Sequence, residues 1–193
     1  MDGRLHRSLA ESAAEAARIA RGVTPDQLPG ATPCAEYDTR TLVNHWVLYT
    51  SHGLEHRARR TPIPDELLSR DFTAEEGWAT GYAAQLDRAV DAWADPAVWE
   101  GEIDSGGGTT PAPALAALLL AELVIHSWDV ARATGQAYRC SEETAGAVLA
   151  VVGEHAELYR QYQGFGDPVT VPGTASALDR ALALSGRDPR WSG

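Results

Sequence analysis

The chain contains no lysine, and it has only two cysteines, two phenylalanines and one methionine among its 193 residues. All 16 basic residues are therefore arginine, and with 27 acidic residues the formal net charge is −11. An acidic chain repels the phosphates of nucleic acids unless its arginines gather on one face. The densest group, Arg57, Arg59 and Arg60, is interpreted as a solvated helix end, so no nucleic-acid partner is predicted.

Long apolar runs are also missing. The longest, at 114–121, ends at Glu122 and falls short of the roughly 18–20 residues that a membrane span needs. The first residues form no apolar signal region, so we predict a cytoplasmic protein without membrane association. Cys34 and Cys140 are far apart in different contexts, and we interpret them as reduced, buried thiols rather than a disulfide.

Helical periodicity dominates the sequence, and no convincing β-pattern or internal repeat is present. It predicts an all-α bundle of five long helices and one short C-terminal helix. Their expected ranges are about 4–22, 39–58, 73–94, 111–135, 141–162 and 174–185. We expect residues 1–163 to form a helical metal-binding bundle, with residues 164–193 packed on the same domain as an extension.

Side chains that favour helix ends set these boundaries. Asp38 and Ser141 are suited to cap the helices that follow them, and Thr73–Glu76 has the sequence of a capping box. The glycines at 106–108 predict a flexible loop over 104–108. About 15 residues connect the second and third helices, which is enough for the chain to cross over rather than reverse.

Glu122 and His126 are the most informative residues, because they lie four apart in a helix whose preceding segment is nearly pure alanine and leucine. Their side chains leave the same helix face about one turn apart. A glutamate in such a helix is costly unless it is paired, protonated or bound to a cation. Two interpretations remain open: a Glu–His hydrogen bond within the core, or two ligands of a divalent metal.

A third ligand would have to come from another apolar helix, and His45 lies in such a segment. Alone, His45 is typical of a buried core histidine. Combined with Glu122 and His126, it makes two imidazoles and one carboxylate with coordination positions left open, as in reactive metal sites. His52 and His56 follow on nearly the same stripe, so either is a candidate for the pocket mouth or a proton shuttle. The alternative, which we favour, is that both are partly exposed and merely lie nearby.

Three further residues have both a functional and a structural interpretation. Asp129 either orients a ligand imidazole from behind or forms a surface ion pair with Arg132. Trp128 is retained as a pocket candidate, although a core position is favoured for it. Cys34 has no base beside it in the sequence and is interpreted as a packed thiol rather than a nucleophile.

Three segments, Thr32–His45, Glu122–Gly135 and Phe165–Trp191, resemble the actinobacterial branch of the DinB/YfiT-like metalloenzymes. This branch is related to the metal-binding domain of mycothiol-dependent maleylpyruvate isomerase. The resemblance covers nearly the whole chain, and Glu-x3-His-x-Trp-Asp is its most specific element. It implies a DinB-like four-helix bundle with an up-down-down-up course, and it implies that His45, Glu122 and His126 are the metal ligands.

The same resemblance implies a chemistry. A zinc-like ion, with nickel and manganese as alternatives, would hold water or a thiolate at an open position, and mycothiol is the small thiol of this branch. We therefore expect metal-dependent thiol transfer to a small electrophile, or its thiol-assisted isomerisation. The alternative is a non-catalytic metal-binding or ligand-sensing helical module, and a homodimer is compatible with either.

Overall fold

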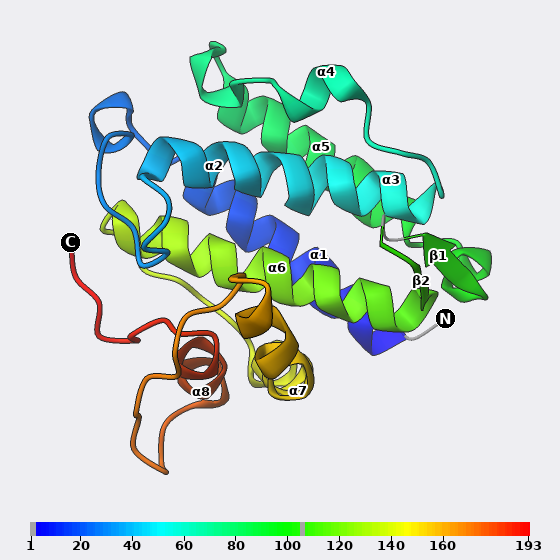
Figure 1. Ribbon diagram of the computed structural model, residues 1–193. Helices are drawn as coiled ribbons and strands as arrows, with labels where there is room; N and C mark the ends of the chain where they lie inside the picture. The colour runs from blue at the N-terminus through cyan, green and yellow to red at the C-terminus, as the bar shows by residue number, and fades with distance from the viewer. Residues whose placement is uncertain (1–2, 105–106) are drawn as a thin grey trace.

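The computed structural model describes residues 3–104 and 107–193, and these residues are mostly helical (Figure 1). The α-helices are α1 (Gly3–Ala20), α2 (Thr39–Val47), α3 (Leu54–Ala58), α4 (Asp65–Leu68), α5 (Trp78–Ala92), α6 (Ala112–Ala133), α7 (Glu142–Gln161) and α8 (Ala177–Leu184). The π-helical segment η2 (Leu48–Gly53) joins α2 to α3. The remaining helical turns are 3-10 helices, η1 (Pro25–Gln27), η3 (Phe72–Ala74) and η4 (Pro96–Trp99). The predicted long helices are present, most of them within a few residues of their expected ends.

The predicted helix over 39–58 is one rod made of α2, η2 and α3. The Asp38 side chain accepts from the Thr41 backbone N–H at 2.8 Å and begins it as expected. Inside the rod, the Thr50 and Ser51 hydroxyls donate to the carbonyls of Trp46 and Val47, both at 2.6 Å. A π-helical stretch turns each residue through a smaller angle than an α-helix does. Residues beyond it therefore face a different direction from the one that α-helical spacing predicts.

The predicted start of the third long helix at Thr73 is wrong. Asp71 caps the short turn η3 instead, by accepting from the Thr73 backbone N–H. Glu75, which lies inside the predicted capping box, forms an ion pair with Arg70. Gly77 then adopts a left-handed conformation, with φ at +72°, so α5 begins only at Trp78.

The absence of β-structure is a second prediction that the fold corrects. β1 (Glu102–Asp104) and β2 (Thr109–Pro111) form an antiparallel pair, with Ile103 opposite Thr110. The predicted loop over 104–108 lies partly outside the described residues.

Arg57 and Arg60 hold this hairpin to the end of α3. Arg57 donates to the Asp104 carbonyl at 2.7 Å, and Arg60 donates to the carbonyls of Glu100 and Glu102. The arginine group is therefore more than a solvated helix end, because two of its members bind backbone carbonyls next to and within the hairpin.

Helix α6 is the central element of the fold. It packs against α1 and α2 on one side and α7 on the other, and α8 packs on α7 (Figure 1). Leu120 belongs to a core cluster shared with α7 and α8, while Leu123 belongs to a second cluster shared with α1, α2 and α5. α6 is long and apolar enough to cross a membrane, but 72% of its most apolar window is buried inside the fold. A helix buried from several directions is apolar all round, as residues 112–121 of α6 are.

The central position of α6 predicts a large packing loss at Leu123, which is completely buried. We expect Leu123→Ala to lower the free energy of unfolding by about 2–5 kcal/mol, because it leaves a cavity between helices. Leu68→Ala removes the same atoms from a side chain that is 51% exposed. It should change that free energy by less than about 0.5 kcal/mol. Urea unfolding measures both values, and equal losses would contradict this account of the core.

Candidate metal centre

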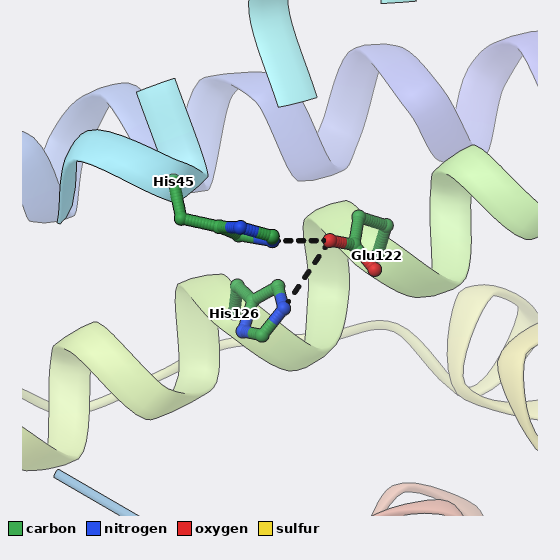
Figure 2. A group of neighbouring side chains, drawn as sticks. All are labelled: His45, Glu122 and His126. Carbon is green, nitrogen blue, oxygen red and sulfur yellow. Dashed lines mark hydrogen bonds and ion pairs between the residues drawn. The ribbon is translucent and has the colours of Figure 1, made fainter. Parts of the chain in front are cut away.

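Helices α2 and α6 bring His45, Glu122 and His126 together, as their pattern in the sequence predicts (Figure 2). The Nε2 atom of His45 lies 2.8 Å from Oε1 of Glu122, and Nε2 of His126 lies 3.2 Å from the same oxygen. Each residue offers one ligand atom, and these atoms all lie within 4.8 Å of one another. Both imidazoles therefore direct the same ring nitrogen toward one carboxylate.

The three side chains differ in exposure. His126 is 10% exposed, whereas His45 and Glu122 are 24% and 34% exposed. The cluster thus has one buried side and one side open to a cavity. The rings of Tyr37 and Tyr49 lie 5.4 Å and 4.7 Å from the His45 ring and flank it.

The open side faces a cavity of about 720 Å³. Helices α6 and α7 supply apolar lining residues, among them Leu118, Ile125 and Val151. Segments before α2 and after α7 contribute Tyr37 and Phe165. Such a space is large enough for a small molecule to reach Glu122 and the two histidines.

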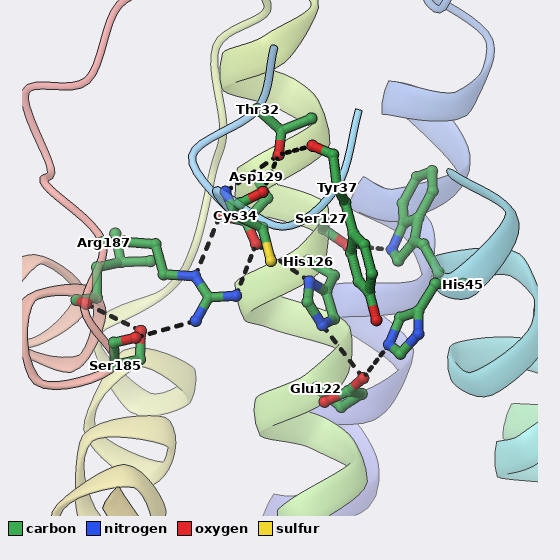
Figure 3. Close-up of polar contacts among 12 residues, drawn as sticks. Thr32, Cys34, Tyr37, His45, Glu122, His126, Ser127, Asp129, Ser185 and Arg187 are labelled. Atoms are coloured by element: carbon green, nitrogen blue, oxygen red, sulfur yellow. Dashed lines mark hydrogen bonds and ion pairs between the residues drawn. The ribbon is translucent and has the colours of Figure 1, made fainter. Parts of the chain in front are cut away.

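Asp129 lies behind His126, on the side away from Glu122 (Figure 3). Its Oδ2 atom is 3.1 Å from Nδ1 of His126, and its side chain is completely buried. These contacts match the interpretation in which Asp129 orients the imidazole of His126. The proposed ion pair with Arg132 is wrong, because Arg132 bonds the Trp191 carbonyl and lies over the Trp128 ring.

The other predicted pocket residues lie elsewhere. His52 stacks on Phe72 with 5.5 Å between ring centroids and is absent from the cavity wall. His56 bonds the Thr61 hydroxyl and is likewise absent from that wall. The physical reason is η2, because its π-helical geometry breaks the seven-residue spacing that joined His52 to His45. Trp128 is 5% exposed and is part of the core rather than the cavity.

Cys34 lines the cavity, although its sequence environment predicted only a packed thiol. Burial raises the pKa of this thiol, and the positive charge of Arg187 only partly opposes the effect. Burial also raises the pKa of Cys140, to about 12, and both cysteines are free. Burial therefore disfavours the thiolate form of both cysteines in the metal-free chain.

Arg187 is a neighbour of the cluster that the sequence did not predict. Its guanidinium binds both oxygens of Asp129, although 58 residues separate them in the chain. The short segment Gly186–Asp188 carries no periodic or spacing signal that would point to Asp129. The resemblance noted for Phe165–Trp191 was the only hint that this segment matters.

The charges of the cluster shift its ionisation. Burial alone would raise the pKa of Glu122, but His126 and His45 lower it below the ordinary range. Burial alone would lower the pKa of His126, but Glu122 and Asp129 outweigh it and raise the pKa to about 9. In the metal-free chain His126 is therefore a cation held between two carboxylates near neutral pH.

Residues 9–131 match the model of the mycothiol maleylpyruvate isomerase N-terminal domain, which is more than half of the chain. The chain belongs to this family. Its predicted relationship to mycothiol-dependent maleylpyruvate isomerase is thus confirmed. His45, Glu122, His126 and Asp129 all fall inside the matched residues, whereas Arg187 lies beyond them.

Similar proteins from Mycobacterium tuberculosis extend the likeness along the chain. Two proteins described as uncharacterized, from strains CDC 1551 / Oshkosh and ATCC 25618 / H37Rv, are each 28% identical to it over 178 residues. The alignments cover 90% of this chain and 92% of each relative. No solved structure matches the chain. The family model matches residues 9–131, whereas the two relatives align with most of this chain.

The raised pKa of His126 predicts a pH dependence of stability in the metal-free chain. The folded-state pKa of about 9 exceeds the ordinary value of 6.5, so the contribution is complete below pH 6.5 and is lost as pH rises through 9. We expect the free energy of unfolding to fall by up to about 3 kcal/mol over that interval. Urea unfolding in the presence of a chelator measures it. His126→Gln should flatten the dependence, and an identical slope in both proteins would contradict the assignment.

Proposed function

We propose that this chain binds one divalent metal ion through His45, Glu122 and His126 and is a metal-dependent thiol transferase or isomerase acting on a small electrophile. The observation that carries the proposal is the approach of two Nε2 atoms to one carboxylate oxygen at the wall of a cavity. A hydrogen-bonded core pair would need neither the third residue nor the cavity.

The donor set fits such an ion. Two imidazoles and one carboxylate leave coordination positions open, a set that suits zinc and also nickel or manganese. The ligand atoms of the three residues already lie close together on two packed helices, so no backbone rearrangement is needed to gather them. When bound, the ion would lower the pKa of a thiol or water at its open position.

The surrounding residues give the site its orientation and its shelter. Asp129 accepts from Nδ1 of His126, which leaves Nε2 as the ligand atom. Tyr37 and Tyr49 flank the His45 ring and limit its rotation. Leu118 and Ile125 make part of the cavity wall apolar, which favours the exclusion of water from a reacting thiol.

The family points to the thiol, since its description names mycothiol. We propose mycothiol, or a thiol of that type, as co-substrate, and a small electrophile as the second partner. We also propose that the protein is cytoplasmic and has no nucleic-acid or membrane partner. A homodimer is compatible with this function.

We also propose an arrangement for the helices. α1, the α2–α3 rod, α5 and α6 would be the four helices of a DinB-like bundle with an up-down-down-up course. Residues 164–193, with α8, would form the extension of the domain made by residues 1–163. In support, Ala181 of α8 belongs to the same core cluster as Leu120 of α6.

Metal content tests the ligand assignment. After removal and reloading of metal, the wild-type chain should hold one equivalent of zinc by elemental analysis. His45→Ala and Glu122→Gln should weaken binding, measured by chelator competition, by more than the roughly 10–100-fold cost of losing an outer partner. His155→Ala, which removes an imidazole outside the cluster, is the matched control. Full metal content and affinity in His45→Ala would refute the assignment.

Turnover tests the enzymatic part. We expect mycothiol or N-acetylcysteine to be conjugated to monochlorobimane faster than the uncatalysed background, and only in the metal-loaded protein. Chelation should abolish the rate, and His45→Ala should lower it at least about tenfold, because its metal is lost. Metal binding with no rate over a panel of thiols and electrophiles would favour the non-catalytic metal-binding or ligand-sensing module instead.

A further inference from the structure

We infer that Arg187 is a positioning residue of the proposed metal site, acting through Asp129 on the ligand His126. The inference rests on the proposed function, and it adds the C-terminal segment to a site whose other members lie on α2 and α6. Arg187 itself lies outside the residues 9–131 that the family model matches.

A chain of contacts connects Arg187 to the ligand atom (Figure 3). Arg187 donates from Nη2 to Oδ2 of Asp129 at 3.1 Å and from Nε to Oδ1 at 3.4 Å. Oδ2 of Asp129 is also the atom that lies 3.1 Å from Nδ1 of His126. The opposite ring nitrogen of His126 faces Glu122. Any rotation of the Asp129 carboxylate would therefore turn the imidazole that carries the ligand atom.

Arg187 is held in place from several sides. Its Nη1 donates to the Ser185 carbonyl at 3.0 Å, and the guanidinium lies 5.7 Å from the centroid of the Phe165 ring. The preceding Gly186 has φ at +87°, and a Cβ there would lie 2.7 Å from the Cα of Gly166. Two loops of the C-terminal segment thus touch through glycine backbones, and this contact fixes the point from which Arg187 reaches Asp129.

Burial makes Arg187 necessary to Asp129. The Asp129 side chain is completely buried and that of Arg187 is 5% exposed, so water does not replace either partner. A buried carboxylate that loses its cation is strongly destabilised, and it must find a new partner or move. The fork of an arginine also fixes the plane of the carboxylate, which a lysine ammonium does not.

Replacing both Arg187 and Asp129 distinguishes an ion pair that only stabilises the fold from one that also positions His126. Apolar residues of similar volume can replace a buried ion pair without loss of stability, but they cannot accept from the Nδ1 of His126. Stability and metal affinity should therefore separate in a variant that replaces both members. Outer partners of histidine ligands typically change metal affinity 10–100-fold when they are lost.

The experiment compares Arg187→Met, Arg187→Lys and the double variant Asp129→Leu with Arg187→Met. Arg190→Met is the matched control, because Arg190 lies on the same segment and its side chain is 82% exposed in an ion pair with Asp188. Each full-length protein is titrated with cobalt, read by its visible spectrum, and with zinc against a chelator. Urea unfolding of the metal-free proteins gives their stabilities.

We expect Arg187→Met to bind zinc and cobalt about 10–100-fold more weakly, with a changed cobalt spectrum, and Arg187→Lys to lie between it and the wild type. The double variant should recover part of the stability that Arg187→Met loses, because Nδ1 of His126 still lacks its acceptor, and it should not recover affinity. It keeps the inference falsifiable if Arg187→Met fails to fold. Wild-type affinity and spectrum in Arg187→Met, or in the double variant, would overturn the inference while leaving the metal site intact. A wild-type chain that binds neither ion would overturn the proposed function itself, and the role of Arg187 with it.

Discussion

The structure depends on burying charge in an apolar helix. Glu122, His126 and Asp129 lie on α6, which the rest of the fold covers on several sides. Each of these groups would be unstable alone in such surroundings. They are stable because each contacts a partner. Arg187 binds Asp129, and Asp129 contacts His126. Glu122 lies between His126 and His45 and contacts both. Of the parts that surround α6, α2 contributes His45 and the segment after α8 contributes Arg187.

This arrangement also accounts for the shape of the site. Asp129 is completely buried, and Arg187 is only 5% exposed although it lines the cavity. Glu122 and His45 are the more exposed members at the cavity wall. The buried contacts therefore lie on one side of Glu122 and His126 and the cavity lies on the other, an arrangement compatible with the proposed metal site. Cys34 lines the same cavity, and burial raises the pKa of its thiol.

Local sequence rules predicted much of this and failed where two signals competed. The Asp38 and Ser141 caps and the α-helical spacing of Glu122 and His126 were correct, because neighbouring residues within one helix decide them. The capping box at Thr73 failed because Asp71 competed for the same backbone group. His52 was a candidate for the pocket because its segment has ordinary α-helical periodicity. In the structure it lies in the π-helical segment η2, which changes the direction of its side chain.

The composition of one segment was enough to predict that α6 is buried and that the charged residues on it need partners. The resemblance to the family could also be seen without a structure, because the residues of each motif are consecutive in the chain. The partners that those charged residues receive could be found only from the packing. His45 reaches Glu122 across 77 positions and Arg187 reaches Asp129 across 58, and such contacts depend on how helices and loops pack rather than on any local pattern.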